Sequence, residues 1–108
     1  MEVEYYTTAG GKNLILDYID SLPKKESAYG YDIIEDLLED GLEMLDEMDT
    51  RHIEGKLWEV KFYNHNRIFY ALVDSDRIYL LHACKKQKNK AERFELKTAR
   101  KRMGEINK

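Results

Sequence analysis

The sequence predicts an α+β fold, in which an antiparallel sheet packs against a helical hairpin and a further helix follows. Three observations predict it. Apolar residues recur at helical spacing between residues 12 and 40. They alternate with polar residues between residues 57 and 63, and two further strand-like runs, 67–73 and 77–84, follow after short polar turns. Helical spacing returns after residue 89. The predicted order is β-α-α-β-β-β-α, in one domain that covers residues 1–108.

The N-terminal half is expected to form one short strand and two helices. Residues 2–7 are aromatic and β-branched, which favours a strand that ends before Gly10-Gly11. Residues 12–22 place their apolar side chains on one helical face. Pro23 suits the first position of a second helix, and Gly41 suits its C-terminal end. The tight connection predicts a hairpin that covers one face of the sheet.

The second half is expected to form the rest of the sheet. Residues 42–55 are ambiguous, and we interpret them as a loop with one helical turn. An antiparallel meander follows, with strands over 57–63, 67–73 and 77–84. The sheet face opposite the hairpin is then expected to present the polar residues of these strands.

A capping box predicts the start of the last helix. Asn89 is followed three residues later by Glu92, and apolar residues then recur at helical spacing as far as about Met103.

Charge is divided unevenly along the chain. The net charge is −3, from 18 Lys+Arg and 21 Asp+Glu. Residues 1–50 hold 14 acidic and three basic residues, whereas residues 51–108 hold 15 basic and seven acidic residues. We interpret this split as an acidic hairpin behind a basic sheet and last helix. The overall pI of about 5.6 therefore does not exclude a nucleic-acid ligand.

Several function classes are excluded by what the sequence lacks. Its apolar stretches are too short to span a membrane, and its first residues do not resemble a signal peptide, so we expect a cytoplasmic protein without a membrane partner. One cysteine, Cys84, allows neither an internal disulfide nor a Cys-rich zinc site, and it is expected to be a buried structural thiol. No motif for a metal or for a phosphate-binding loop occurs, so no cofactor is expected.

Basic residues gather where the predicted strands end. Lys61 and Arg67 flank the first turn of the meander, and like charges this close favour an anion between them. Four lysines follow the third strand: Lys85, Lys86, Lys88 and Lys90. The functional interpretation is a cationic bowl that binds a phosphodiester. The alternative is an ordinary solvated face of the sheet.

Histidines are the natural candidates for acid and base chemistry. His82 lies among apolar residues, so the alternative is a buried, hydrogen-bonded side chain. His65 lies beside Arg67 in a turn, and its alternative is an exposed turn residue. His52 belongs to no recognisable constellation.

The second half of the chain resembles the RelE/ParE toxin superfamily, and more closely its HigB-like, phage-derived branch. The likeness rests on the order of five short motifs: Leu57-Trp58-Glu59-Val60-Lys61, Arg67-Ile68-Phe69-Tyr70, Leu80-Leu81-His82, Lys85-Lys86 and Ala99-Arg100. The N-terminal strand and the hairpin fit the same pattern. This sequence departs from the family in lacking the C-terminal active-site tyrosine of many relatives, and in having Lys61 where the branch often has arginine.

The resemblance implies a metal-independent endoribonuclease that cleaves mRNA on the ribosome. It implies a cognate helix-turn-helix antitoxin, HigA-like, as the protein partner. By resemblance Lys61 is the candidate for proton abstraction and Arg67 binds the phosphate. Lys85 or Lys86 contacts the transition state or the leaving group, and Lys86 is taken as the catalytic one. Residues implied to hold the RNA are Lys85, Lys88, Lys56 and Lys90. Arg67 is expected to lie on the surface, so that its replacement by Ala leaves the fold intact.

Two other functions remain open for this sequence. One is a ParE-like protein that inhibits DNA gyrase by protein contact. The other is a phage-derived domain of the same fold without nuclease activity. A convergent Lys61, Arg67 and Lys86 favours the nuclease, because a gyrase inhibitor does not need these residues close together.

Overall fold

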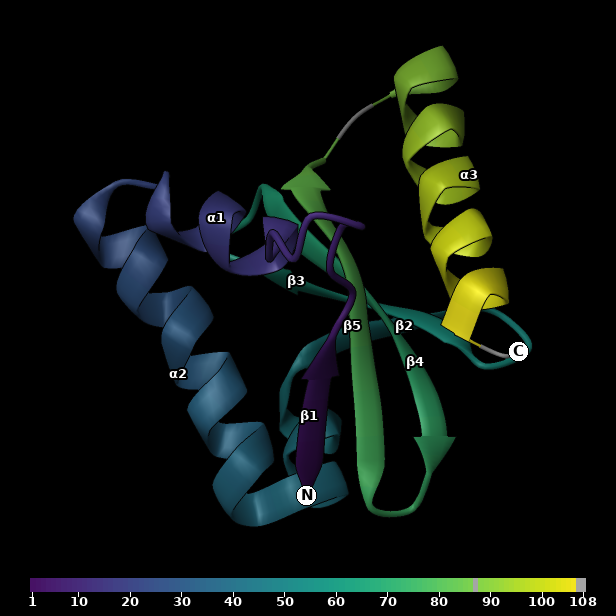
Figure 1. Cartoon of the computed structure of the whole chain (residues 1–108). Coiled ribbons are helices and arrows are strands. Elements are labelled where there is room, and N and C mark those ends of the chain that lie inside the picture. The colour runs from purple at the N-terminus through teal and green to yellow at the C-terminus, as the bar shows by residue number, and fades with distance from the viewer. Residues whose placement is uncertain (87, 107–108) are drawn as a thin grey trace.

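The strands predicted in the second half of the chain form the middle of the sheet. The computed structural model describes residues 1–86 and 88–106. Its sheet has the strand order β1-β5-β4-β3-β2, with β1 parallel to β5 and the other neighbours antiparallel (Figure 1). The predicted α+β fold is confirmed. The strands are β1 (Glu2–Tyr5), β2 (Asp49–Glu54), β3 (Leu57–Phe62), β4 (Asn66–Asp74) and β5 (Arg77–Lys85).

Local signals set the ends of the helices. The Asn13 side chain accepts a hydrogen bond from the amide of Leu16 and caps α1. Pro23 is the residue before α2, and Gly41 ends that helix with a φ of 72°. The helical elements are α1 (Leu14–Asp20), α2 (Lys24–Asp40), the 3-10 helix η1 (Gly41–Glu47) and α3 (Asn89–Ile106).

Helices cover both faces of the sheet (Figure 1). The α1–α2 hairpin packs Ile15, Ile19 and Leu37 against Val60 and Phe62, as the helical spacing predicts. On the other face, α3 packs around its buried Ala99, and the strands contribute Leu57, Phe69, Ala71, Leu81 and Cys84. The expectation that this second face presents polar residues is met only in part, because Glu59, Lys61 and Arg67 lie on it beside these apolar side chains. The central strands carry apolar side chains on both faces, and a sheet of that kind needs a cover on each side.

The region between residues 42 and 55 is more ordered than the sequence predicts. It forms η1 and then the edge strand β2, which pairs with β3 and turns back at Gly55 with a φ of 51°. The predicted helical turn is present as η1, whereas the loop predicted for the rest of the region is wrong. An edge strand with most side chains in solvent needs no apolar alternation, so the pattern DTRHIE gives no strand signal.

The β3–β4 turn positions two of the candidate site residues, Lys61 and Arg67. Tyr63 and Asn64 have φ values of 52° and 63°, the left-handed pair that a tight hairpin requires. This turn places Lys61 directly opposite Arg67 in the β3–β4 register. The predicted proximity of these two cations is confirmed.

Candidate functional site

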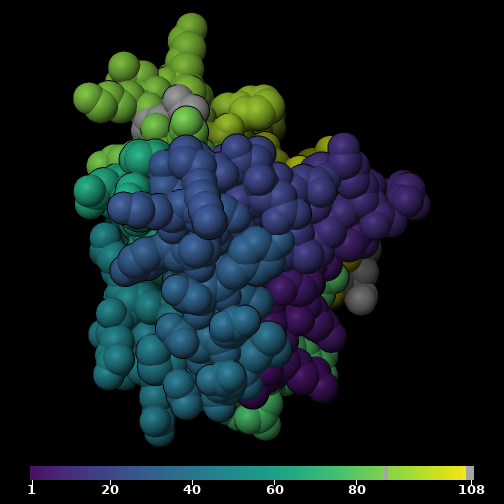
Figure 2. All heavy atoms as spheres, turned by 90° about the vertical axis from the view of Figure 1, so that its left-hand side faces the viewer, coloured from purple at the N-terminus to yellow at the C-terminus, as the bar shows by residue number. Residues whose placement is uncertain are grey.

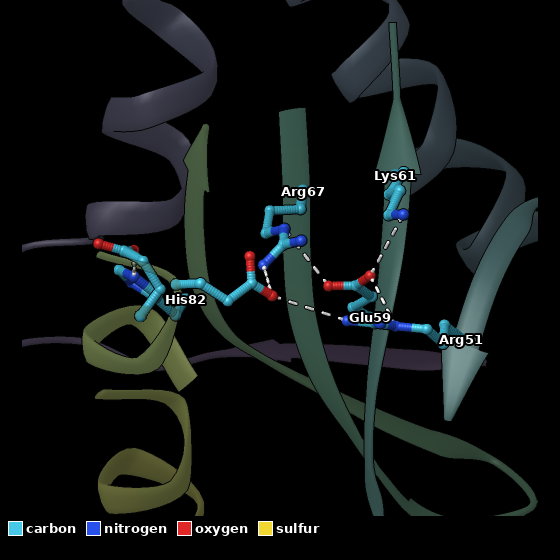
Figure 3. A network of polar contacts seen from close by, with 7 residues as sticks. Arg51, Glu59, Lys61, Arg67 and His82 are labelled. Carbon is cyan, nitrogen blue, oxygen red and sulfur yellow. Dashed lines mark hydrogen bonds and ion pairs between the residues drawn. The ribbon is translucent and has the colours of Figure 1, made fainter. Parts of the chain in front are cut away.

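Three cations from three neighbouring strands converge on one carboxylate. Arg51 of β2, Lys61 of β3 and Arg67 of β4 lie 3.1, 3.8 and 3.3 Å from the Glu59 carboxylate, measured from nitrogen to oxygen (Figure 3). Strand alternation produces this arrangement, because Glu59 and Lys61 point to the same face of β3 and Arg67 pairs with Lys61.

A second carboxylate reaches the cluster from α3. Glu92 lies 3.1 Å from Arg67 Nη1 and 3.8 Å from Arg51 Nη2. These five residues, Arg51, Glu59, Lys61, Arg67 and Glu92, are called the ion-pair cluster below. Three positive charges meet two negative ones, so the cluster keeps one excess positive charge.

Arg67 is buried rather than on the surface. Its side chain is 1 % exposed and that of Glu59 is fully buried, whereas Glu92 is 25 % exposed. The guanidinium also lies over the ring of Phe69, 5.3 Å from its centroid. The expectation of a surface-lying Arg67 is wrong, because α3 covers the strand face on which it lies.

Some buried side-chain atoms of the ion-pair cluster lack a hydrogen bond. Among the described residues, both Glu59 oxygens and Arg67 Nε are buried and have no hydrogen bond of good geometry. They are held by ion pairs instead, and a desolvated charge depends strongly on its partner. The cluster is thus sensitive to any charged ligand that offers better geometry.

The lysines after β5 lie at the same end of the sheet. Lys85 pairs with Asn66 in the β4–β5 register, and the amide of Lys86 donates to the carbonyl of His65 at 2.7 Å. The lysine segment, which is Lys85, Lys86, Lys88 and Lys90, is exposed. The structure therefore brings Lys85 and Lys86 close to the turn between Lys61 and Arg67.

Lys56 lies away from the other cations. It precedes β3, whereas Lys61 lies near the end of that strand. Five residues of strand separate the two positions by roughly 17 Å. The structure thus separates Lys56 from the candidate RNA-binding residues named with it.

His65 is tied to the helical hairpin. Its Nε2 lies 2.7 Å from a Glu26 oxygen, to which the Asn66 amide also donates at 2.8 Å. These contacts lower the pKa of Glu26, with the Asn66 hydrogen bond as the largest cause. Tyr18 donates in turn to Asn66, and burial raises the pKa of Tyr18 to about 12. The network fixes the β3–β4 turn against α1 and α2.

His82 has both ring nitrogens engaged. Arg102 Nη1 lies 3.2 Å from Nδ1, and Nε2 contacts Glu95. A guanidinium can only donate, so Nδ1 accepts and the proton is on Nε2, which donates to Glu95. Burial lowers the pKa of His82, which keeps the ring neutral. This is the buried, hydrogen-bonded alternative rather than a free acid or base.

Cys84 lies beside His82 and Glu95. Burial, together with the nearby Glu95 carboxylate, raises the pKa of the Cys84 thiol. The ligand atoms of His82, Cys84 and Glu95 lie within 4.8 Å of one another, a spacing that suits a metal. A metal on His82 Nε2 would, however, move the ring proton to Nδ1, which faces the Arg102 donor. The donor set therefore fits a hydrogen-bond cluster better than a metal site.

Three members of the ion-pair cluster were not among the sequence candidates. The sequence did not single out Arg51, because the residues of β2 show no alternation of apolar and polar side chains. Glu59 carries a readable signal, since it alternates with Lys61 on one strand face. Glu92 reads as a capping residue, and only the packing of α3 shows its contact with Arg67.

A family model matches residues 17–104 of the chain, described as Phage derived protein Gp49-like (DUF891). The chain belongs to this family. The Gp49-like family is part of the RelE/ParE-like toxin superfamily, so the resemblance at superfamily level is confirmed. It is a toxin-like domain of toxin–antitoxin systems. No curated protein matches the chain.

The matched range of the Gp49-like domain includes the whole ion-pair cluster and the lysine segment. Among the described residues, none of the helices has the length and apolar character needed to cross a bilayer.

Proposed function

We propose that this Gp49-like protein is a HigB-like toxin, a metal-independent endoribonuclease that cleaves mRNA on the ribosome and is neutralised by a cognate helix-turn-helix, HigA-like antitoxin. The observation that supports it most is the convergence of Arg51, Lys61 and Arg67 beside the exposed lysine segment. A cationic site of this kind stabilises the charge that develops on a phosphorane during RNA cleavage.

The proposed reaction forms one bond and breaks one. The ribose 2′-oxygen attacks the adjacent phosphorus, its proton passes to Lys61, which acts as the base in its neutral amine form once released from Glu59, and the bond from phosphorus to the 5′-oxygen breaks. Lys86 supplies a proton to the departing 5′-oxygen, and the products are a 2′,3′-cyclic phosphate and a 5′-hydroxyl end. Arg67 neutralises the phosphorane, and Lys85, Lys88 and Lys90 hold neighbouring phosphates.

The closed ion-pair cluster requires one exchange before this reaction. Arg67 is covered, and Glu92 occupies the position beside it that a phosphate would take. An RNA phosphate would therefore displace Glu92 from Arg67, through movement of the first turns of α3. Glu92 is the accessible member of the pair of carboxylates, so it is the one that can leave.

The experiment combines purified protein, ribosomes and a translated mRNA, with cleavage read by primer extension. We expect cuts within the translated region that persist when transition metals are chelated and magnesium is kept. Lys86→Ala should reduce the cleavage rate by about a hundredfold, the usual effect of losing one group that stabilises a transition state. Lys56→Ala is the matched control, because it removes the same charge at the opposite end of β3.

Two outcomes would contradict the proposal. Intact mRNA, together with arrested growth and DNA damage on expression, would favour a ParE-like inhibitor of gyrase. Intact mRNA with normal growth would favour an inactive domain of the same fold. Equal loss of cleavage in the Lys86 and Lys56 variants would overturn the site assignment alone.

A further inference from the structure

A groove on the hairpin side of the molecule shares only Lys61 with the residues of the proposed chemistry. It has a volume of about 570 Å³ and lies between α2 on one side and η1, the start of β2 and the β3–β4 turn on the other. Figure 2 views this side, where residues of η1 to β3 flank α2. A volume of this size accommodates several side chains of a partner.

The floor of the groove is apolar and adaptable. Ile33 and Phe62 are buried at its base, and Met44 and Met48 are half-buried beside them. Methionine side chains repack easily around different partners, which is typical of surfaces that accept helices.

Two tyrosines stand at one end of the groove. Tyr29 is 52 % exposed and Tyr63 is 42 % exposed, with their rings 6.3 Å apart edge to face. Tyr63 also has a positive φ of 52°, an uncommon conformation for a large side chain. Exposed tyrosines beside an apolar floor are the usual anchors of a protein interface, and their faces attract arginine and lysine.

The rim of the groove is acidic on both sides. Asp32 and Asp36 line it from α2, and Glu47 and Asp49 line it from η1 and β2. Lys61 also lines the groove, but its ammonium group pairs with Glu59. An acidic rim repels a phosphate backbone and attracts a cationic polypeptide.

We propose that this groove docks an amphipathic helix of a protein partner, with apolar residues on the face that enters and Lys or Arg at its flanks. Apolar anchors at helical spacing would enter between Ile33 and the two methionines, while basic side chains would meet the four rim carboxylates. This inference rests on the proposed function in one respect: the partner is then the antitoxin. A docked helix would also cover Lys61, which links binding of the partner to loss of RNA access.

The test uses a designed helical peptide of about 18 residues, long enough to be helical in water, with leucines on one face and lysine and arginine on the other. Its affinity for the full chain is measured by fluorescence anisotropy. We expect saturable binding that protects the backbone amides of α2 and η1 from hydrogen exchange. A peptide with Lys and Arg replaced by Glu is the charge control and should not bind.

Matched variants locate the site. Asp32→Asn with Asp36→Asn should weaken binding about tenfold, as expected for two partly exposed charges. Glu35→Gln with Glu39→Gln removes the same charge from the exposed side of α2 and should leave the affinity unchanged. Equal weakening by both pairs, no binding, or equal binding of the acidic peptide would overturn the proposal.

A single-stranded oligouridylate serves as the competing ligand. If Asp32→Asn with Asp36→Asn weakens RNA binding rather than peptide binding, the groove holds nucleic acid and the docking proposal fails. Peptide binding needs no ribosome, so its outcome is independent of the nuclease assay. Binding without mRNA cleavage would overturn the proposed function and leave the docking surface standing.

Discussion

At the scale of single residues, the decisive feature is a charged side chain buried beside its counter-ions. Arg67 and Glu59 are both removed from water, and each is the other's partner. Burying such a pair gains little stability, but removing one member leaves the other charged and unpaired. Arg67 therefore has a structural role in addition to the proposed role in phosphate binding.

Replacing Arg67 by Ala should destabilise the fold by about 3–5 kcal/mol, because Glu59 is left without its buried partner. Urea unfolding measures this loss. Lys86→Ala is the control, since an exposed side chain should change the unfolding free energy by no more than about 0.5 kcal/mol. Unfolding of the Arg67 variant at the wild-type urea midpoint would contradict the burial of this ion pair.

The pH dependence of stability should reveal His82. Burial lowers its pKa, so below the ordinary value of 6.5 the unfolded chain takes up a proton that the folded chain does not. Stability is therefore present above that value and is lost as the pH falls from it towards the lowered folded pKa.

Thermal unfolding between about pH 7.5 and 5.5 tests this prediction. Wild-type stability should fall across the interval, and a His82→Gln variant should lose less over the same interval. Parallel curves for the two proteins would assign the pH dependence to other groups.

At the scale of elements, α3 determines whether the cationic site is open. Its apolar side packs on the sheet around Ala99, and its first turns place Glu92 beside Arg67 and Arg51. A helix that combines packing with a counter-ion contact closes the ion-pair cluster without any partner present.

Glu92→Gln should raise the affinity for RNA about threefold to tenfold, because it removes the carboxylate that competes with phosphate for Arg67. Binding of a single-stranded oligonucleotide by fluorescence anisotropy measures the change. Glu105→Gln removes the same charge near the other end of α3 and should change the affinity little. A drop in affinity in the Glu92 variant would show that this carboxylate assists RNA binding instead.

At the scale of the whole molecule, charge is separated by face. The acidic residues of α2 and η1 line the groove, while the lysine segment extends from the end of β5. Net charge, which is −3, therefore predicts neither surface. We expect each surface to attract a ligand of opposite sign, and Lys61 belongs both to the groove and to the ion-pair cluster.

The salt dependence of RNA binding should report the lysine segment alone. Lys85→Gln with Lys86→Gln should make the slope of log affinity against log salt shallower by about 1.4, since each phosphate contact on a single strand contributes about 0.7. Lys56→Gln should leave the slope unchanged, because Lys56 lies at the other end of β3. A change of equal size for Lys56 would mean that RNA follows the length of the strand.

The sequence by itself determined the strongly periodic parts of this protein. Alternation in β3, the apolar runs of β4 and β5, helical spacing in α1, α2 and α3, and the short turn between Lys61 and Arg67 are local patterns, and local patterns follow from backbone geometry. They placed Lys61 next to Arg67 and the lysine segment at the end of β5.

Only the tertiary structure decided which of those residues are accessible. The edge strand β2 carries Arg51 without an apolar period, because an edge strand needs no second buried face. Glu92 meets Arg67 across 25 residues of sequence, and no local pattern encodes that contact. Burial depends on how α3 packs across the sheet, so the same arginine that reads as a surface residue in the sequence is enclosed in the folded chain.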